Sequence, residues 1–208
     1  MASWGQSRVY SGATHSPGTD PRMALTFKEL SHAPRSQLEG LMKDSKGPAL
    51  GSIAGYEFRG FNVLYPHEKA VMWILGNVRF IKCFFPEDRT APLPKDPTEL
   101  RGYNLKVKNG SVDDPWSTTP NEATPTKIGR YKVYPSRNLP GKNLYPNAVF
   151  LDYAQPENNL FSGSTIQDYL VQPDPQNPDL LLGKAFTNLW VMTPATYFIL
   201  ERLQPHTR

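Results

Sequence analysis

Short runs of alternating apolar and polar residues, separated by turn residues, dominate the chain from residue 53 to residue 203. Successive side chains of a β-strand point to opposite faces, so a period of two predicts strands with one buried face. Strands at this spacing, with few helices between them, are typical of an antiparallel meander that closes on itself. The runs are IAGYEFRGFNVLY, VRFIKCFF, YNLKVKNGSV, KIGRYKVY, NAVFLDY, TIQDYLVQ, DLLLGKAF and TYFILERL. We therefore predict a mainly β fold, an antiparallel barrel of roughly eight strands, whose interior holds side chains or one small ligand.

Helix and turn signals set the limits of this domain. PRSQLEGLMKDSK, from Pro34, and PHEKAVMWILG, ending at Gly76, each predict a short helix. The 21 prolines and 15 glycines predict extended, proline-rich segments outside the sheet. Asn109–Gly110 predicts a tight hairpin. We expect an extended N-terminal arm over residues 1–33, the barrel domain over residues 34–203 and a tail over residues 204–208.

Basic residues gather in the middle of the chain. The formal net charge is +4, and residues 101–145 carry eight Lys or Arg against three Asp or Glu. Such a bias can attract phosphates, anionic lipid or an acidic partner. The charges are spread out, unlike the clusters of nucleic-acid-binding modules, so we favour a solvated loop region and expect no nucleic-acid partner.

Cysteine and histidine are sparse. Cys83 is the only cysteine, which excludes an internal disulfide and favours a reducing compartment. It lies in the apolar run RFIKCFF, where a buried, inert thiol is expected. The histidines, His15, His32, His67 and His206, lack the spacing of a zinc site. We therefore predict neither a metal site nor a cofactor.

The N-terminal segment bears on location and partners. No apolar run approaches the roughly 20 residues of a membrane-spanning helix, and the first residues lack the hydrophobic segment of a secretory signal. We expect an intracellular protein, in the cytoplasm or inside an organelle (mitochondrion or plastid), and not a secreted one. Residues 1–24 are polar and turn-rich and would lose too much entropy by becoming ordered alone, so we expect them to contact protein partners.

The last quarter of the chain carries a family resemblance. Residues 149–202 run through VFLDY, IQDYL, LLLG and YFILER, an order that resembles the C-terminal half of small lipocalin-like proteins of the GXWXG type. Those proteins also end in a closing aromatic strand with Leu-Glu-Arg. At the front, GYEFRG has Phe58 in place of their tryptophan, with a shifted spacing between Gly55 and Gly60. The resemblance implies a calycin-like barrel and no particular chemistry.

Ionisable side chains that interrupt the apolar strands are the candidate site residues. In one interpretation they form a ligand pocket, with mostly apolar walls and a few polar anchors. The anchors would be Arg59, Lys82, Asp152 and Asp168, and the walls Trp73, Tyr103, Tyr153 and Tyr169. In the other, which we favour, ion pairs close the barrel at the strand ends. Asp168 or Glu201 would then pair with Arg59 or Arg202.

Two classes of function are compatible with these residues. The first is a non-catalytic lipocalin-like domain, an accessory subunit of a larger assembly that could hold a hydrophobic or lipid ligand in its barrel. The second is a small-molecule isomerase, cyclase or hydrolase that uses Asp168 or Asp152 as acid or base. The chain has no Gly-x-Ser-x-Gly elbow and no phosphate-binding loop, which favours the first class. An acid–base aspartate should face an open cavity with no cation paired to it.

Overall fold

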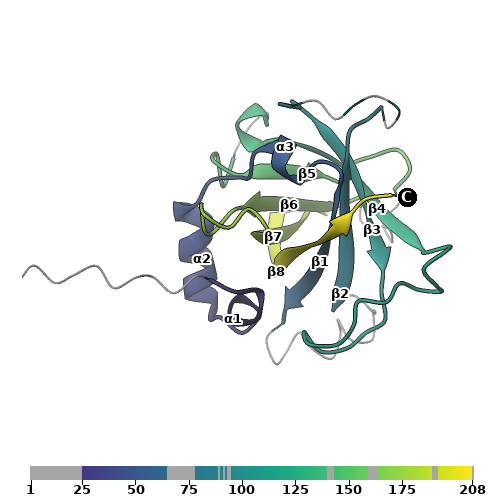
Figure 1. Cartoon of the computed structure of the whole chain (residues 1–208). Helices are drawn as coiled ribbons and strands as arrows, with labels where there is room; N and C mark the ends of the chain where they lie inside the picture. Colours follow the sequence, from purple (N-terminus) through teal and green to yellow (C-terminus); the bar gives the residue numbers. More distant parts are fainter. Residues whose placement is uncertain are drawn as a thin grey trace, which may run out of the picture.

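The chain forms a closed β-barrel. A computed structural model describes residues 25–64, 78–88, 90, 92, 95–139, 143–158, 164–188 and 192–207. Eight antiparallel strands pair in sequence order, and β1 pairs with both β2 and β8 (Figure 1). They are β1 (Tyr56–Val63), β2 (Arg79–Phe85), β3 (Leu100–Lys106), β4 (Lys127–Pro135), β5 (Val149–Asp152), β6 (Ile166–Val171), β7 (Leu180–Asn188) and β8 (Met192–Pro205). The predicted mainly β, eight-stranded antiparallel barrel is confirmed.

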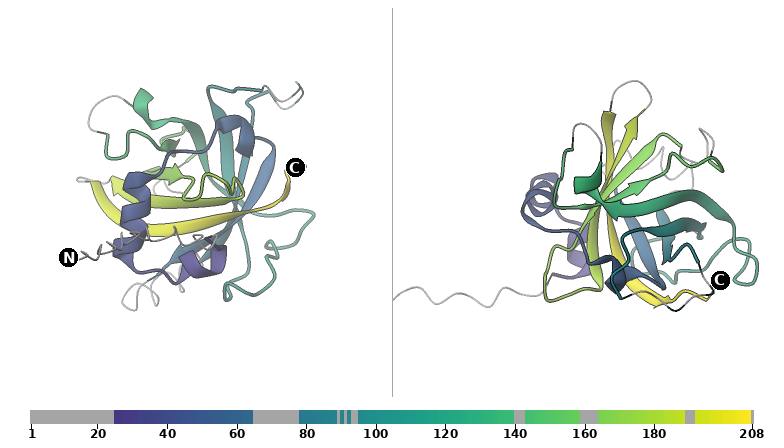
Figure 2. Two further views of the ribbon diagram at one scale, coloured as in Figure 1. Left: turned by 60° about the vertical axis from the view of Figure 1, so that its left-hand side comes forward. Right: turned by 90° about the horizontal axis from the view of Figure 1, so that it is seen from above.

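Short helices precede the first strand. Within the described residues they are α1 (Phe27–Ser31), α2 (Arg35–Asp44) and α3 (Leu50–Ile53), and a 3-10 turn, η1 (Ser136–Asn138), follows β4. α1 packs against β8 and α2 against β7, on the side of the barrel opposite the end of the chain (Figure 1 and Figure 2). The helix predicted from Pro34 is confirmed as α2, whereas the one predicted over residues 66–76 lies outside the described residues. No helix that the structure describes is long and apolar enough to cross a membrane.

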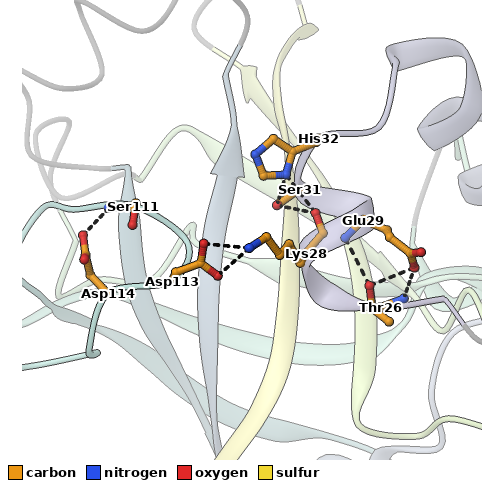
Figure 3. Close-up of polar contacts among 8 residues, drawn as sticks. All are labelled: Thr26, Lys28, Glu29, Ser31, His32, Ser111, Asp113 and Asp114. Atoms are coloured by element: carbon orange, nitrogen blue, oxygen red, sulfur yellow. Dashed lines mark hydrogen bonds and ion pairs between the residues drawn. The ribbon is translucent and has the colours of Figure 1, made fainter.

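The segment expected to be an extended arm contains α1. Thr26 caps this helix, because its Oγ1 accepts a hydrogen bond from the Glu29 backbone while the Glu29 carboxylate accepts one from the Thr26 backbone (Figure 3). Phe27, the first helical residue, is buried against the barrel. The prediction of extended chain is therefore wrong for residues 27–31, and residues 1–24 lie outside the described part of the chain.

The end of the domain also differs from the predicted boundary. β8 continues to Pro205, which pairs with Tyr56 of β1. The backbone N–H of His206 donates to the Gly55 carbonyl at 2.7 Å. Residues 204 and 205 are therefore part of the barrel wall, and residue 206 is hydrogen-bonded to the residue before β1. The prediction of a tail from residue 204 is wrong for these three residues.

The tight hairpin predicted at Asn109–Gly110 does not form. Residues 107–126 are a long loop between β3 and β4 that folds over the outer face of the barrel. Arg79 of β2 donates to the carbonyls of Asp114 and Pro115, at 2.6 and 2.8 Å, and its guanidinium lies 3.8 Å from the ring centre of Trp116. These contacts from a distant strand replace the local turn.

The barrel interior is one apolar cluster to which all eight strands contribute. Leu50 and Ile53 of α3 belong to the same cluster, so this helix closes one end of the barrel. Phe58 of β1 is fully buried there, 5.6 Å from the ring centre of Phe84 on β2. The α3 helix was not predicted, because four residues are too few to show a helical period.

Three strand glycines make room for aromatic rings inside the barrel. A Cβ atom added at Gly60, Gly102 or Gly183 would lie only 2.2, 2.1 or 2.0 Å from a ring atom. The rings are those of Phe80, Tyr131 and Phe198, respectively. Each ring lies over a glycine of a neighbouring strand, on the inner face of the barrel wall.

The α2 helix is fastened to the barrel by a polar anchor at Glu39. Its carboxylate accepts hydrogen bonds from Lys184 Nζ of β7 at 2.6 Å, Tyr197 OH of β8 at 2.5 Å and Tyr145 OH at 3.0 Å. Partial burial by itself would raise the pKa of Glu39, but the bonds from Lys184, Tyr197 and Tyr145 outweigh it and lower the pKa from 4.5 to about 2. The ionised carboxylate thus stabilises the docked helix.

We predict that Glu39→Gln lowers the free energy of unfolding by about 1–3 kcal/mol at neutral pH, because hydrogen bonds to an ionised acceptor are lost. The folded pKa lies below the unfolded one, so this stabilisation is complete above about pH 4.5 and disappears as the pH falls toward 2. Urea unfolding of the two proteins from pH 7 to pH 2 measures it. Asp44→Asn, on the exposed end of the same helix, is the control and should change little. A stability difference that does not shrink in acid would contradict the role of the Glu39 charge.

Candidate functional site

The buried polar centre of the barrel is formed by Lys82, Asn104, Tyr153 and Asp168, which we call the lumen cluster. Lys82 on β2 faces inward and pairs in register with Asn104 on β3. Asp168 lies on the face of β6 that carries the interior residue Leu170, and Tyr153 directly follows β5. Period-two alternation points these four side chains inward, and barrel closure brings them together from four elements.

Hydrogen bonds saturate the Lys82 ammonium. Its Nζ donates to Asn104 Oδ1 at 3.1 Å, to Tyr153 OH at 2.5 Å and to Asp168 Oδ2 at 3.1 Å. Tyr153 OH in turn donates to Asp168 Oδ2 at 3.1 Å. The side chains of Lys82 and Asp168 are only 3% and 4% exposed, so this is a buried ion pair with hydrogen bonds around it.

Aromatic rings enclose the same ammonium. Lys82 Nζ lies 4.9–5.3 Å from the ring centres of Phe80, Tyr131, Tyr153 and Phe198. A cation at this distance from aromatic faces is attracted by their negative charge, most strongly when water is excluded. Three of these rings lie over Gly60, Gly102 and Gly183, so the strand glycines and the cage around the lysine form one packing unit.

Burial governs the protonation of the cluster. It lowers the pKa of Lys82, and the attraction of the Asp168 carboxylate opposes this shift. Burial also raises the pKa of Tyr153 well above its ordinary value, and the nearby charge of Asp168 raises it further. Tyr153 therefore keeps its proton at neutral pH and acts as a donor to the carboxylate.

One oxygen of Asp168 has no partner within the described protein. Oδ2 accepts from both Lys82 and Tyr153, whereas Oδ1 is buried and accepts no hydrogen bond. A buried acceptor without a donor is unfavourable by about 1–3 kcal/mol. Such an atom calls for a water molecule or a ligand group that donates to it.

The structure separates the other predicted pocket residues from the lumen cluster. Tyr103 and Tyr169 belong to clusters on the outer face of the barrel, and Arg59 lies between the rings of Phe27 and Trp116, at 4.7 and 5.0 Å from their centres. The predicted eight-residue pocket is therefore wrong as a single site. Tyr169 directly follows Asp168 in the strand, so the two side chains cannot both face the lumen.

Two predicted candidates remain, Asp152 and Trp73. Asp152 ends β5, and its carboxylate accepts from Tyr134 OH at 3.4 Å and from the Ala154 backbone at 2.9 Å. Neither of these described partners belongs to the lumen cluster. Trp73 lies outside the described residues. Sequence reasoning missed Asn104, although its place directly after Tyr103 puts it on the opposite, inward face.

One ion pair named by the favoured interpretation is present, Arg59 with Glu201, although it lies within β1 and β8 and not at their ends. Arg59 Nε donates to Glu201 Oε2 at 2.7 Å, across the β1–β8 pairing. Arg202 Nε donates to Asp179 Oδ1 at 2.5 Å, and its second amino group donates to the Ser52 carbonyl. Asp168 is also ion-paired, but its partner is Lys82 and not an arginine.

Two surface hollows lie away from the lumen cluster. A groove of about 480 Å³ is lined by residues of β3 and β4 and of the segment after β5, among them Arg101, Lys132 and Gln155. A hollow of about 130 Å³ lies between α2 and residues 144–148. Neither is lined by Lys82 or Asp168, so an acid–base role for Asp168 gains no support from them.

We predict that Lys82→Met destabilises the protein by about 3–5 kcal/mol, because it leaves the buried Asp168 carboxylate without its cation. Methionine has a similar length and suits the aromatic cage. Adding Asp168→Asn should restore most of the loss, since the amide needs no counter-charge. Urea unfolding of the wild type, both single variants and the double variant measures the coupling. Lys106→Met, at the exposed end of β3, is the control, and similar losses in Lys82→Met and Lys106→Met would contradict a buried pair.

The lumen cluster can bind and orient a polar group, since it combines an ammonium, a protonated phenol and an acceptor oxygen in a low-dielectric enclosure. Comparison of the chain with protein-family models and with curated protein sequences found no match. The chemistry of the site is therefore inferred from its own geometry.

Proposed function

We propose that the protein is a non-catalytic lipocalin-like binding domain, related to the GXWXG type, which holds a small and mainly apolar molecule in its barrel. Its ligand carries one hydroxyl or amino group that donates a hydrogen bond to Asp168 Oδ1. An eight-stranded barrel has an interior of the size that takes one small ligand. The burial of Phe58 inside the barrel supports the relation, because this residue stands where the resemblance places a tryptophan.

The observation that carries the proposal is the unpartnered oxygen of Asp168. It is the acceptor that the lumen cluster leaves open, while Lys82 has already used its three donors on protein acceptors. In this proposal the hydroxyl or amino group of the ligand supplies the donor that Oδ1 lacks within the described protein. Apolar walls around one charged acceptor select ligands with a donor over isosteres without one.

The alternative, an isomerase, cyclase or hydrolase with Asp168 or Asp152 as acid or base, is less well supported. Asp168 has a cation at 3.1 Å on one of its oxygens, which is the arrangement of an orienting ion pair. Asp152 makes its described hydrogen bonds at the end of β5, to Tyr134 and the Ala154 backbone. Neither aspartate meets the expected pattern of a free carboxylate that faces an open cavity.

We predict that 2-naphthol binds to the protein at least about tenfold more tightly than 2-methoxynaphthalene, because a hydrogen bond to a charged acceptor contributes about 1.5–3 kcal/mol. The two probes share one ring system, and only the naphthol can donate. Isothermal titration calorimetry of the full chain gives both affinities.

Variants of the two aspartates provide the matched control. Asp168→Asn should remove most of the preference for naphthol, and Asp152→Asn should leave it unchanged. Circular dichroism of each variant checks that the barrel is intact, and the wild-type comparison of the two probes does not depend on any variant. Equal affinities for the two probes, or no binding of either up to its solubility, would refute the lumen-binding proposal.

We further propose that the protein is an intracellular accessory subunit, attached to its assembly through residues 1–24. The capped helix α1 supports this, since it docks the beginning of the described chain on the outer face of the barrel. An ion pair also joins α1 to the β3–β4 loop, because Lys28 Nζ lies 2.8 Å from the Asp113 carboxylate (Figure 3).

Deletion of residues 1–24 should leave the folded barrel intact and abolish the binding of a partner at fixed stoichiometry. Native mass spectrometry of material from the source cells, for the full chain and for residues 25–208, tests this. The same partner on both proteins would place the contact on the barrel and not on the arm. A full chain recovered as a bare monomer would count against the accessory role.

A further inference from the structure

A second cluster of chemically active side chains lies outside the lumen, where four neighbouring strands place them side by side. In the sheet register, Glu57 of β1 lies opposite Gln204 of β8 and opposite Cys83 of β2. Cys83 in turn lies opposite Tyr103 of β3. His206 follows the last residue of β8 and turns back over this row.

The ligand-type atoms of this row converge. Glu57, Cys83 and His206 each offer one atom, and these three atoms lie within 4.8 Å of one another. His206 Nδ1 is 3.0 Å from Glu57 Oε1. Glu57 and Cys83 are fully buried, and the side chain of His206 is only 4% exposed. A buried carboxylate, thiol and imidazole at such distances are unlike the exposed acidic groups that gather on protein surfaces by chance.

Two of the three side chains, those of Glu57 and His206, also form hydrogen bonds with neighbouring residues. Gln204 Nε2 donates to the second carboxylate oxygen of Glu57 at 2.8 Å. The second ring nitrogen of His206 lies 3.3 Å from Tyr103 OH, and its ring stacks on Phe85 with centres 5.3 Å apart. Metal-binding imidazoles and carboxylates are oriented by hydrogen bonds of this kind from the side away from the metal.

We propose that Glu57, Cys83 and His206 bind a divalent transition-metal ion, with zinc as the best match. Thiolate, imidazole and carboxylate are the donors that zinc takes in proteins, and three protein ligands leave a fourth position for water. Hard ions such as magnesium or calcium do not suit a thiolate. The negative thiolate and carboxylate balance the charge of the ion inside a buried site.

The geometry requires only a small contraction. Zinc bonds of about 2.0–2.3 Å put tetrahedral ligand atoms about 3.3–3.7 Å apart, against the present limit of 4.8 Å. His206 is just beyond the end of β8, so its side chain can adjust without breaking strand pairing. The site lies on the outer face, in the cluster of Cys83 and Tyr103, and the barrel wall separates it from the lumen cluster. It is therefore independent of ligand binding in the barrel.

The test uses the full chain without a histidine tag. Zinc affinity is measured by competition with a chromophoric chelator, and cobalt is used as a spectroscopic substitute. We expect one ion per chain and, with cobalt, a thiolate-to-metal charge-transfer band that is absent in Cys83→Ser. Tyr103→Phe should weaken zinc binding by about tenfold, as loss of an outer partner does. His206→Ala should weaken it more strongly than Tyr103→Phe.

His32→Ala is the matched control, because this histidine lies on the exposed end of α1, away from the cluster. It should bind zinc as the wild type does. His206 lies beyond the end of β8, so His206→Ala should leave the barrel folded. This variant therefore tests zinc binding even where Cys83→Ser disturbs the barrel. The proposal is overturned by the absence of a thiolate band in the wild type, or by equal zinc affinity in the His206→Ala and wild-type proteins.

Discussion

The pairing of β1 with β8 is the constraint on which the rest of the structure depends. It converts an eight-stranded sheet into a closed surface with an inside and an outside, and it leaves no open sheet edge there. The same pairing sets Arg59 against Glu201 and brings the end of the chain beside Glu57. The Arg59–Glu201 ion pair and the contact of His206 with Glu57 are thus both consequences of barrel closure.

Inside the barrel, a charge pair and aromatic packing together stabilise the buried Lys82. Burial of a charged lysine is unfavourable unless a carboxylate and favourable dipoles surround it. Asp168 supplies the charge, Tyr153 and Asn104 supply hydrogen-bonding groups, and aromatic rings surround the ammonium. The strand glycines are part of this solution, because the rings occupy the volume that their side chains would have taken.

The outer surface is largely covered, and its coverings differ in kind. α1 and α2 bury the outer faces of β7 and β8, with Glu39 as the polar anchor of α2. The β3–β4 loop covers the neighbourhood of β2 through Arg79 and Trp116. The row from His206 to Tyr103 lies under neither helix, and His206 and Phe85 shield it instead. Function on the two sides of the wall can therefore be separated by mutation.

The sequence by itself determined the strands, the antiparallel barrel and the helix α2. The alternation of side chains between two faces is a property of the backbone geometry of each strand, so it can be recognised within a few residues of sequence. Local signals failed where distant side chains intervened: Arg79 holds the β3–β4 loop in place of a hairpin at Asn109–Gly110.

Only the tertiary structure decided which residues meet. Lys82 and Asp168 are 86 positions apart, and Glu57 and His206 are 149 positions apart. Alternation divides residues between two faces, but the contacts across the lumen and along the outer wall depend on strand register and on closure. No spacing in the sequence encodes those two quantities, because both arise from the packing of the whole barrel.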